Sequence, residues 1–191
     1  MTTVRPTLTL CCLLLATTLG GCGGGALEAI GLRKPPELPE LQKPPRNVPL
    51  RLHAAQRLNV DERGRPLALA VRVYKLRQKD AFEAAPFAAF LTPQAERESL
   101  GNDLVEVREI MLVPGQRYES VEKVGREAGV VGVVALFHRP AGQRWRATVS
   151  AADAERNGVN IGLYGCAMGL SGAGAVAGDS STAPIASVRC Q

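Results

Sequence analysis

Hydrophobic and polar residues alternate along much of the chain between residues 50 and 165. In residues 67–74, leucine or valine occupies every second position. Successive side chains of a strand point to opposite faces, so this period of two predicts a strand with one buried face. Comparable patterns predict further strands at 50–58, 105–112, 117–124, 130–137, 144–149 and 159–163. The region is therefore expected to form a mainly β domain, a small β-sandwich around one core.

The segment 130–137 is apolar on both faces of its predicted strand. Runs of this kind are typical of strands in the middle of a sheet that is covered on both sides. Turn signals separate neighbouring strands at Pro114-Gly115 and at Pro140-Ala141-Gly142. In the first, proline presets one φ angle and glycine accepts a positive one. We therefore expect strand 130–137 to lie inside a sheet rather than at its edge.

The strand pattern is interrupted between residues 80 and 101, where two short helices are predicted. The first begins with an aspartate variant of a capping box, Asp80 and Glu83. The second is capped by Thr92 and closed by Gly101. An apolar stripe accompanies them, made by Phe82, Phe87, Phe90 and Leu91. We expect this helical insert to pack against the edge of the sandwich.

The first 21 residues have the organisation of a secretory signal. Arg5 precedes an apolar run, 8–19, that is well short of the ~20 residues a membrane-spanning helix needs. The run ends in Leu19-Gly20-Gly21-Cys22, which resembles the lipobox that bacterial lipoprotein processing recognises. We therefore expect cleavage before Cys22 and a covalent lipid on its thiol. The alternative is an ordinary thiol that follows a secretory signal.

The residue after the predicted lipid anchor is Gly23. An aspartate at this position usually retains lipoproteins in the inner membrane, so glycine implies sorting to the outer membrane, with the domain facing the periplasm. Residues 22–49 are rich in proline, which fixes φ and removes a backbone donor, so they are expected to form an extended, semi-rigid tether. The predicted organisation is thus signal 1–21, tether 22–49, β domain 50–165 and tail 166–191.

The tail is rich in glycine, alanine and serine and carries Cys166 and Cys190 near its ends. In an oxidising periplasm, two remaining cysteines suggest a disulfide. Closing a loop of about 25 residues would remove roughly 3 to 4 kcal/mol of unfolded-state entropy in the chain-entropy model. The alternative is a disordered tail with two independent thiols, and the sequence leaves the choice open.

Charge and residue usage exclude several kinds of chemistry. Arg5 is the only charged residue of the signal, so 22 basic and 18 acidic residues remain, a formal excess of four positive charges. This small, scattered excess argues against a nucleic-acid partner. The only histidines, His53 and His138, lack metal-ligand spacing and are read as ordinary strand residues. We predict no enzyme, no metal site and no cofactor apart from the lipid on Cys22.

Several short segments together resemble a known family. Residues 58–66 read LNVDERGRP, and residues 71–76 read VRVYKL. Further landmarks follow in the family's order: Phe82 with Phe87, LGNDL at 100–104, LVPG at 112–115, VGVVALF at 131–137 and Trp145-Arg146. Behind a lipobox, this order resembles the TssJ (VasD, SciN) lipoproteins of type VI secretion systems, over about residues 50–150.

The resemblance implies a transthyretin-like two-sheet sandwich, tethered to the outer membrane, that holds the periplasmic domain of the inner-membrane protein TssM. It implicates the loop 59–66 in that contact, through Asn59, Val60, Asp61, Glu62, Arg63, Gly64 and Arg65. Arg63 and Arg65 suit carboxylates on a partner, while Asp61 and Glu62 could meet basic groups. The chain departs from the family at Val60, where proline is common. Without the resemblance, the loop would read as a solvated hairpin loop.

Two other functions are compatible with a lipid-anchored sandwich. One is a pilotin-like lipoprotein that escorts another secretion component, which would require a secretin as partner. The other is a protein that binds a small ligand or a sugar. Sugar sites favour exposed aromatic residues, yet only 4% of the residues are aromatic and the single tryptophan, Trp145, lies in a predicted strand. The assembly lipoprotein is therefore the leading hypothesis.

Overall fold

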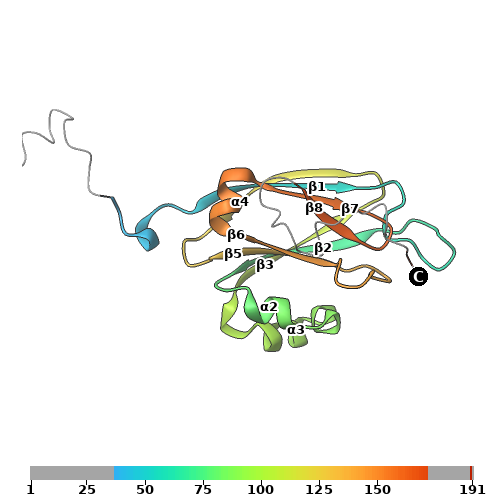
Figure 1. Ribbon diagram of the computed structural model, residues 1–191, viewed down its shortest axis with the longest axis horizontal. Coiled ribbons are helices and arrows are strands. Elements are labelled where there is room, and N and C mark those ends of the chain that lie inside the picture. The colour runs from blue at the N-terminus through green and yellow to red at the C-terminus, as the bar shows by residue number, and fades with distance from the viewer. Residues whose placement is uncertain (1–36, 172–189, 191) are drawn as a thin grey trace, which may run out of the picture. The chain divides into compact units, whose positions relative to one another are not determined.

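The computed structural model of the protein describes residues 37–171 and Cys190. The chain divides into two units, Met1–Pro39 and Glu40–Gln191, and nearly all described residues belong to the second. The strands of this unit are β1 (Arg46–Ala54), β2 (Leu69–Leu76), β3 (Leu104–Leu112), β4 (Arg117–Val124), β5 (Val130–Ala135), β6 (Arg146–Ser150), β7 (Val159–Leu163) and β8 (Met168–Ser171). They form two four-stranded sheets, in the orders β4-β1-β7-β8 and β3-β2-β5-β6, layered in Figure 1. The predicted mainly β fold with two sheets is confirmed.

Strand β1 lies inside its sheet, antiparallel to β4 and parallel to β7. The inward side chains of Val48, Leu50 and Leu52 are at most 1% exposed, whereas Arg51 and His53 face solvent. The strand begins at Arg46, inside the predicted tether and four residues before the predicted start, and it ends at Ala54 rather than at residue 58. Proline had suggested a tether here. The β1–β7 pairing starts only at Leu50, so a proline at the preceding position does not interrupt that ladder.

Strand β5 is the best-covered strand of the second sheet, because it lies between β2 and β6 and all its residues from Val131 to Ala135 are buried. This confirms the predicted central position, although the strand ends two residues before the apolar run does. Gly132 has a specific role on the outer face, where a Cβ atom would lie 2.9 Å from Cζ of Phe82. The missing side chain lets that ring pack directly on the strand.

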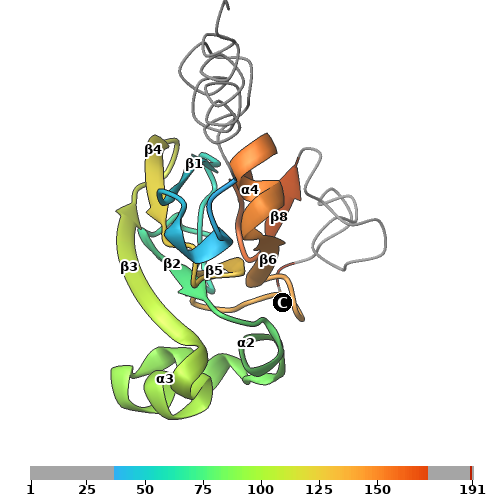
Figure 2. The ribbon, with the colours of Figure 1, turned by 90° about the vertical axis from the view of Figure 1, so that its left-hand side faces the viewer.

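The helical insert between β2 and β3 consists of α2 (Asp80–Ala84), the 3-10 helix η2 (Phe87–Leu91), α3 (Pro93–Leu100) and η3 (Gly101–Asp103). It covers the outer face of the β3-β2-β5-β6 sheet, as Figures 1 and 2 show, so the predicted edge position was wrong. The insert carries three of the four phenylalanines, and these rings pack with Tyr74 and Trp145 at centroid distances of 5.1–5.8 Å. The rings thereby bury the apolar part of the outer face of this sheet.

Polar groups fasten the insert to the sheet. The guanidinium of Arg72 donates to the backbone oxygen of Phe90 at 2.9 Å and contacts the carboxylate of Glu96 at 3.1 Å. The hydroxyl of Tyr74 also donates to Glu96, which is only 5% exposed. Burial raises the pKa of Tyr74, and the neighbouring Glu96 carboxylate raises it further. The buried carboxylate thus has both a cation and a hydroxyl as partners, as buried charges require.

The predicted ends of the second helix are confirmed, whereas the predicted cap of the first helix is not. Oγ1 of Thr92 accepts a hydrogen bond from the backbone N–H of Ala95, and α3 ends at Gly101 with φ +50°, as predicted. The capping box at Asp80 was wrong: Lys79 holds the N-cap position without a side-chain bond, and Glu83 accepts from Thr148 of β6 instead. None of the helices within residues 37–171 is long and apolar enough to cross a membrane.

The last described strand, β8, lies in the segment that was predicted to be an irregular tail, and this corrects the prediction. It pairs antiparallel with β7, Leu163 opposite Met168, and three of its four residues are buried. The prediction missed it because glycine and alanine dominate this part of the chain and give no clear period of two. The short helix α4 (Ala151–Asn157) leads into β7 and is capped by Ser150, whose Oγ accepts from the N–H of Asp153 at 3.1 Å.

Candidate functional site

The loop between β1 and β2, residues 55–68, lies at one end of the sandwich (Figure 1). We call this end the tip; it comprises residues 53–68, 113–117, 136–145 and 164–167 together with Cys190. The opposite end, the base, comprises residues 40–46, 124–130 and 150–158. Strand β1 runs from base to tip, and its nine residues span roughly 30 Å. All predicted partner-binding residues, 59–65, therefore lie at the tip.

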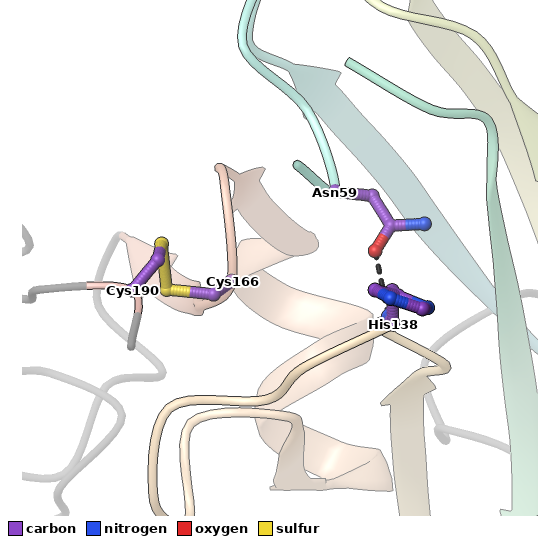
Figure 3. Close-up of a disulfide and its surroundings, with 4 residues drawn as sticks. All are labelled: Asn59, His138, Cys166 and Cys190. Carbon is purple, nitrogen blue, oxygen red and sulfur yellow. Dashed lines mark hydrogen bonds between the residues drawn. A yellow bond between two sulfur atoms is a disulfide. The ribbon is translucent and has the colours of Figure 1, made fainter. Parts of the chain in front are cut away.

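Asn59 supports the loop instead of facing solvent. It is 6% exposed and is the one described non-glycine residue with a positive φ, +44°. Its Nδ2 donates to the backbone oxygen of Ala68 at 2.7 Å, and its Oδ1 accepts from the backbone N–H of His138 at 2.7 Å (Figure 3). Asparagine tolerates this left-handed conformation better than most residues do. Asn59 thereby joins the two ends of its own loop to the β5–β6 connection.

Asp61 organises the exposed part of the loop. Its carboxylate accepts from the backbone N–H groups of Arg63 and Arg65 at 2.9 and 2.8 Å, and from Nε of Arg65 at 2.7 Å. Gly64, with φ +72°, donates its N–H to the backbone oxygen of Asp61 and closes the turn. The backbone hydrogen bond from Arg65 is the main cause that lowers the pKa of Asp61. Asp61 is therefore engaged within the loop and is not displayed to a basic partner.

Among the predicted partner-binding residues 59–65, those with exposed side chains are Glu62, Arg63 and Arg65. Arg65 is 67% exposed although its Nε pairs with Asp61, so its two terminal nitrogens remain available. Arg63 and Glu62 have no side-chain partner within residues 37–171. A guanidinium suits carboxylates because it donates through a planar fork. Of the predicted set, these three residues are the ones placed to contact a partner.

The underside of the loop rests on the segment after β7. The backbone N–H groups of Asn59 and Val60 donate to the oxygens of Tyr164 and Gly165 at 3.0 and 2.8 Å. Next to them, Cys166 and Cys190 form a disulfide with a Cα–Cα distance of 5.6 Å (Figure 3). A Cβ atom on Gly165 would lie 3.1 Å from Sγ of Cys190 and 3.4 Å from Val60. The bond that the sequence left open thus lies directly beneath the loop.

The described part of the chain contains no metal-binding arrangement. His53 lies on β1 with its side chain exposed, as predicted, whereas His138 lies in the β5–β6 connection and not on a strand. Within residues 37–171 and 190, no group of three or more histidine, cysteine, aspartate or glutamate side chains could hold a metal ion. Cys22, the predicted lipidation site, lies outside the described residues.

A family model described as "Type VI secretion lipoprotein, VasD, EvfM, TssJ, VC_A0113" matches residues 46–166. The chain belongs to this family. The match includes all the strands up to β7, the helical insert and the loop at the tip. The family consists of structural secretion lipoproteins and not of enzymes, so the predicted family and the predicted absence of enzymatic activity are both confirmed.

Solved structures share the fold. The T6SS lipoprotein TssJ1 from Pseudomonas aeruginosa is 29% identical, with a TM-score of 0.61, over 70% of this chain and 100% of that one. A chain of a structure described as "Type VI membrane complex" is 24% identical, with a TM-score of 0.61 and coverage of 66% and 98%. A chain of "T6SS protein TssM C-terminal domain (869-1107) from EAEC" is 23% identical, with a TM-score of 0.56 and the same coverage. The last two show the fold alone. No curated protein matches the chain.

Sequence reasoning found the loop but missed how it is held. Asn59 and His138 are 79 residues apart, so no local pattern connects them. A usable signal was present in the residue type, because asparagine is enriched at positive φ. Residues 164 and 165 were assigned to the β domain, and Cys166 and Cys190 were assigned to the tail, although in the structure all four support one loop.

Proposed function

We propose that this chain is an outer-membrane lipoprotein of the type VI secretion membrane complex. A lipid on Cys22 holds the domain at the periplasmic face, and the tip binds the periplasmic domain of a TssM-type inner-membrane protein. The family match over residues 46–166 carries the proposal, because it makes the chain a type VI secretion lipoprotein. Two chains with a similar fold belong to structures whose descriptions name the type VI membrane complex and the TssM C-terminal domain.

The geometry of the domain supports a role at the tip. The chain from the predicted anchor enters the described domain at the base, through Glu40 and Arg46, whereas the loop lies at the far end of β1. The loop is fixed by hydrogen bonds that Asn59 donates and Asp61 accepts, before any partner arrives. A preorganised loop loses little conformational entropy on binding, which favours affinity.

A pull-down tests the partner. The full-length lipidated protein, extracted in detergent and immobilised, should retain the TssM-type periplasmic domain of the same bacterium. The double variant Arg63→Glu and Arg65→Glu should weaken this binding at least about tenfold, since it places like charges against the partner's carboxylates. Lys79→Glu with Arg97→Glu, at exposed positions of the helical insert, is the matched control and should bind normally. Recovery of a secretin instead would favour the pilotin-like alternative.

Fractionation tests the anchor. Cys22→Ser removes the thiol that would carry the lipid, so the variant should leave the outer-membrane fraction while wild-type protein stays in it. Labelling with a radioactive fatty acid should mark wild type and not the variant. Outer-membrane fractionation of an unlabelled Cys22→Ser variant would contradict the proposed anchor.

A further inference from the structure

A shallow pocket of about 340 Å³ lies at the tip, beside the loop, on the outward face of the β4-β1-β7-β8 sheet. It is lined by the end of β1, the start of β4 and the residue that follows β7. The polar side chains among its lining residues are His53, Gln56, Arg117 and Tyr164. Because Gln56 belongs to the β1–β2 loop itself, the pocket is continuous with the proposed partner-binding surface.

The pocket holds hydrogen-bond donors and no acid. His53 and Arg117 are direct cross-strand neighbours in the β1–β4 register, so their Cβ atoms are about 5 Å apart on one face. Neither side chain has a hydrogen-bond or ion-pair partner within residues 37–171. The nearest acid along this face, Glu119, lies opposite Arg51 and lines a separate recess. Two basic side chains thus face the same unfilled space.

Glycine residues shape the pocket walls. Gly162 is paired with His53 on the side of β7, and a Cβ atom there would lie 2.7 Å from the hydroxyl of Tyr164. The Tyr164 ring can therefore lie across the strand beside His53. On the other side, Gly115 has φ +78°, and a Cβ atom there would lie 2.6 Å from Nε2 of Gln56. The absence of both side chains brings the tyrosine hydroxyl and the glutamine amide to the rim.

We propose that this pocket binds the carboxylate of an aspartate or glutamate side chain of the protein partner. The proposal rests on the proposed function and adds the chemistry by which the partner is recognised. A carboxylate accepts two parallel hydrogen bonds from the fork of Arg117, and Gln56, Tyr164 and His53 can supply further donors.

The surroundings favour an acidic protein surface over the membrane. Arg57, Arg63 and Arg139 lie at the same end, are exposed and have no side-chain partner within residues 37–171. These exposed arginines add positive charge to the tip, so a partner with several carboxylates would match it. The chain enters the described domain at the base, at the opposite end of β1 from the pocket.

Charge reversal in the pocket tests the proposal. The probe is the TssM-type periplasmic domain of the same bacterium, and the protein is the full-length lipidated chain in detergent. Arg117→Glu should raise the dissociation constant at least about tenfold. Lys123→Glu is the matched control, since it makes the same charge change on the same strand and face near the base, and it should change the constant less than twofold. Arg117→Gln, with circular dichroism as a check of folding, separates lost charge from introduced repulsion.

The outcomes separate the two proposals. If wild-type protein does not bind the TssM-type domain, the proposed function itself fails. If wild type binds and Arg117→Glu and Lys123→Glu bind equally well, only the carboxylate pocket is overturned. A third measurement compares the affinities of wild type and Arg117→Glu for vesicles that contain phosphatidylglycerol. If Arg117→Glu loses affinity for these vesicles but keeps affinity for the protein domain, the pocket takes lipid phosphate and the proposal is wrong.

Discussion

The base and the tip of the sandwich hold their arginines in different ways. At the base, Arg46 and Arg126 each contact both Glu40 and Glu155, at distances of 2.8–3.6 Å. At the tip, several arginines have no carboxylate partner within residues 37–171: Arg57, Arg63, Arg117 and Arg139. Hydrogen bonds from Lys43 and Arg126 lower the pKa of Glu40, so the acid at the centre of the base network stays charged at neutral pH.

This contrast indicates that the arginines of the base stabilise the fold, whereas those of the tip are available for binding. A guanidinium that already pairs with a carboxylate has to give up that contact before it can bind another. The base arginines tie residues 40–46 to the turn 124–130 and to α4, a task within the fold. Unpaired like charges contribute nothing to the fold and repel one another, so their concentration at one end suits recognition of an acidic surface.

The largest expected effect on stability concerns the disulfide beneath the tip. Cys166→Ser should lower the free energy of unfolding by about 3 kcal/mol, because the cross-link no longer restricts the unfolded chain. Urea unfolding of the purified protein measures this. A reducing agent should destabilise wild type by a similar amount and leave the variant unchanged. Equal stability of wild type, reduced wild type and variant would show that the bond does not support the domain.

A pair of asparagines compares tip and base directly. Asn59→Ala should cost about 2 kcal/mol or more, because the N–H of His138 and the oxygen of Ala68 lose their partner and alanine is strained at positive φ. Asn47→Ala, at an exposed position of β1 near the base, should cost less than about 0.5 kcal/mol. Urea unfolding checks both. Asn59→Gly relieves the strain only, so it should fall between wild type and Asn59→Ala.

Acid should loosen the tip loop through Asp61. Its folded-state pKa is lowered, so the stabilisation is fully present above its ordinary value and is lost as pH falls through the folded pKa. The window therefore lies below about pH 4. Amide chemical shifts of Arg63 and Arg65, followed by NMR, should report the change. Asp61→Asn should remove this titration, and a persistent transition in that variant would assign it to another group.

The smallest effect is expected from the base. Glu40→Gln removes the acid that Arg46 and Arg126 share, yet Glu155 still contacts both arginines. The carboxylate of Glu40 is half exposed, and exposed ion pairs contribute little to stability. Affinity for the TssM-type domain should match wild type in the same binding assay. A large loss of affinity would mean that the base, and not the tip alone, contacts the partner.

Local pattern was enough to place much of the sandwich. The limits of β4 and β7 agree with the predicted segments 117–124 and 159–163, because alternation of buried and exposed side chains is a property of the strand itself. The buried run of β5 predicted its central position for the same reason. The family resemblance also rested on short local segments, and the match over residues 46–166 confirms it.

Features that depend on distant contacts were missed. A stripe of phenylalanines shows that the insert must be covered, but not which side of the sheet it covers. That choice depends on Gly132 and Tyr74, which make space and contacts for Phe82. The structural roles of Asn59 and Asp61 were missed for the same reason, because the sequence does not show whether a polar loop residue faces a partner or holds its own loop.

The parallel pairing of β1 with β7 has a consequence for how the protein acquires its fold. Leu50 lies opposite Val159, so the first strand of the domain pairs with a strand that is more than a hundred residues later in the chain. If export proceeds from the N-terminus, as the predicted signal requires, β1 crosses the membrane long before β7 does. One side of its backbone then stays unpaired until translocation is nearly complete. Unpaired strand edges promote aggregation, so the β1 edge is exposed to this risk until β7 has crossed the membrane.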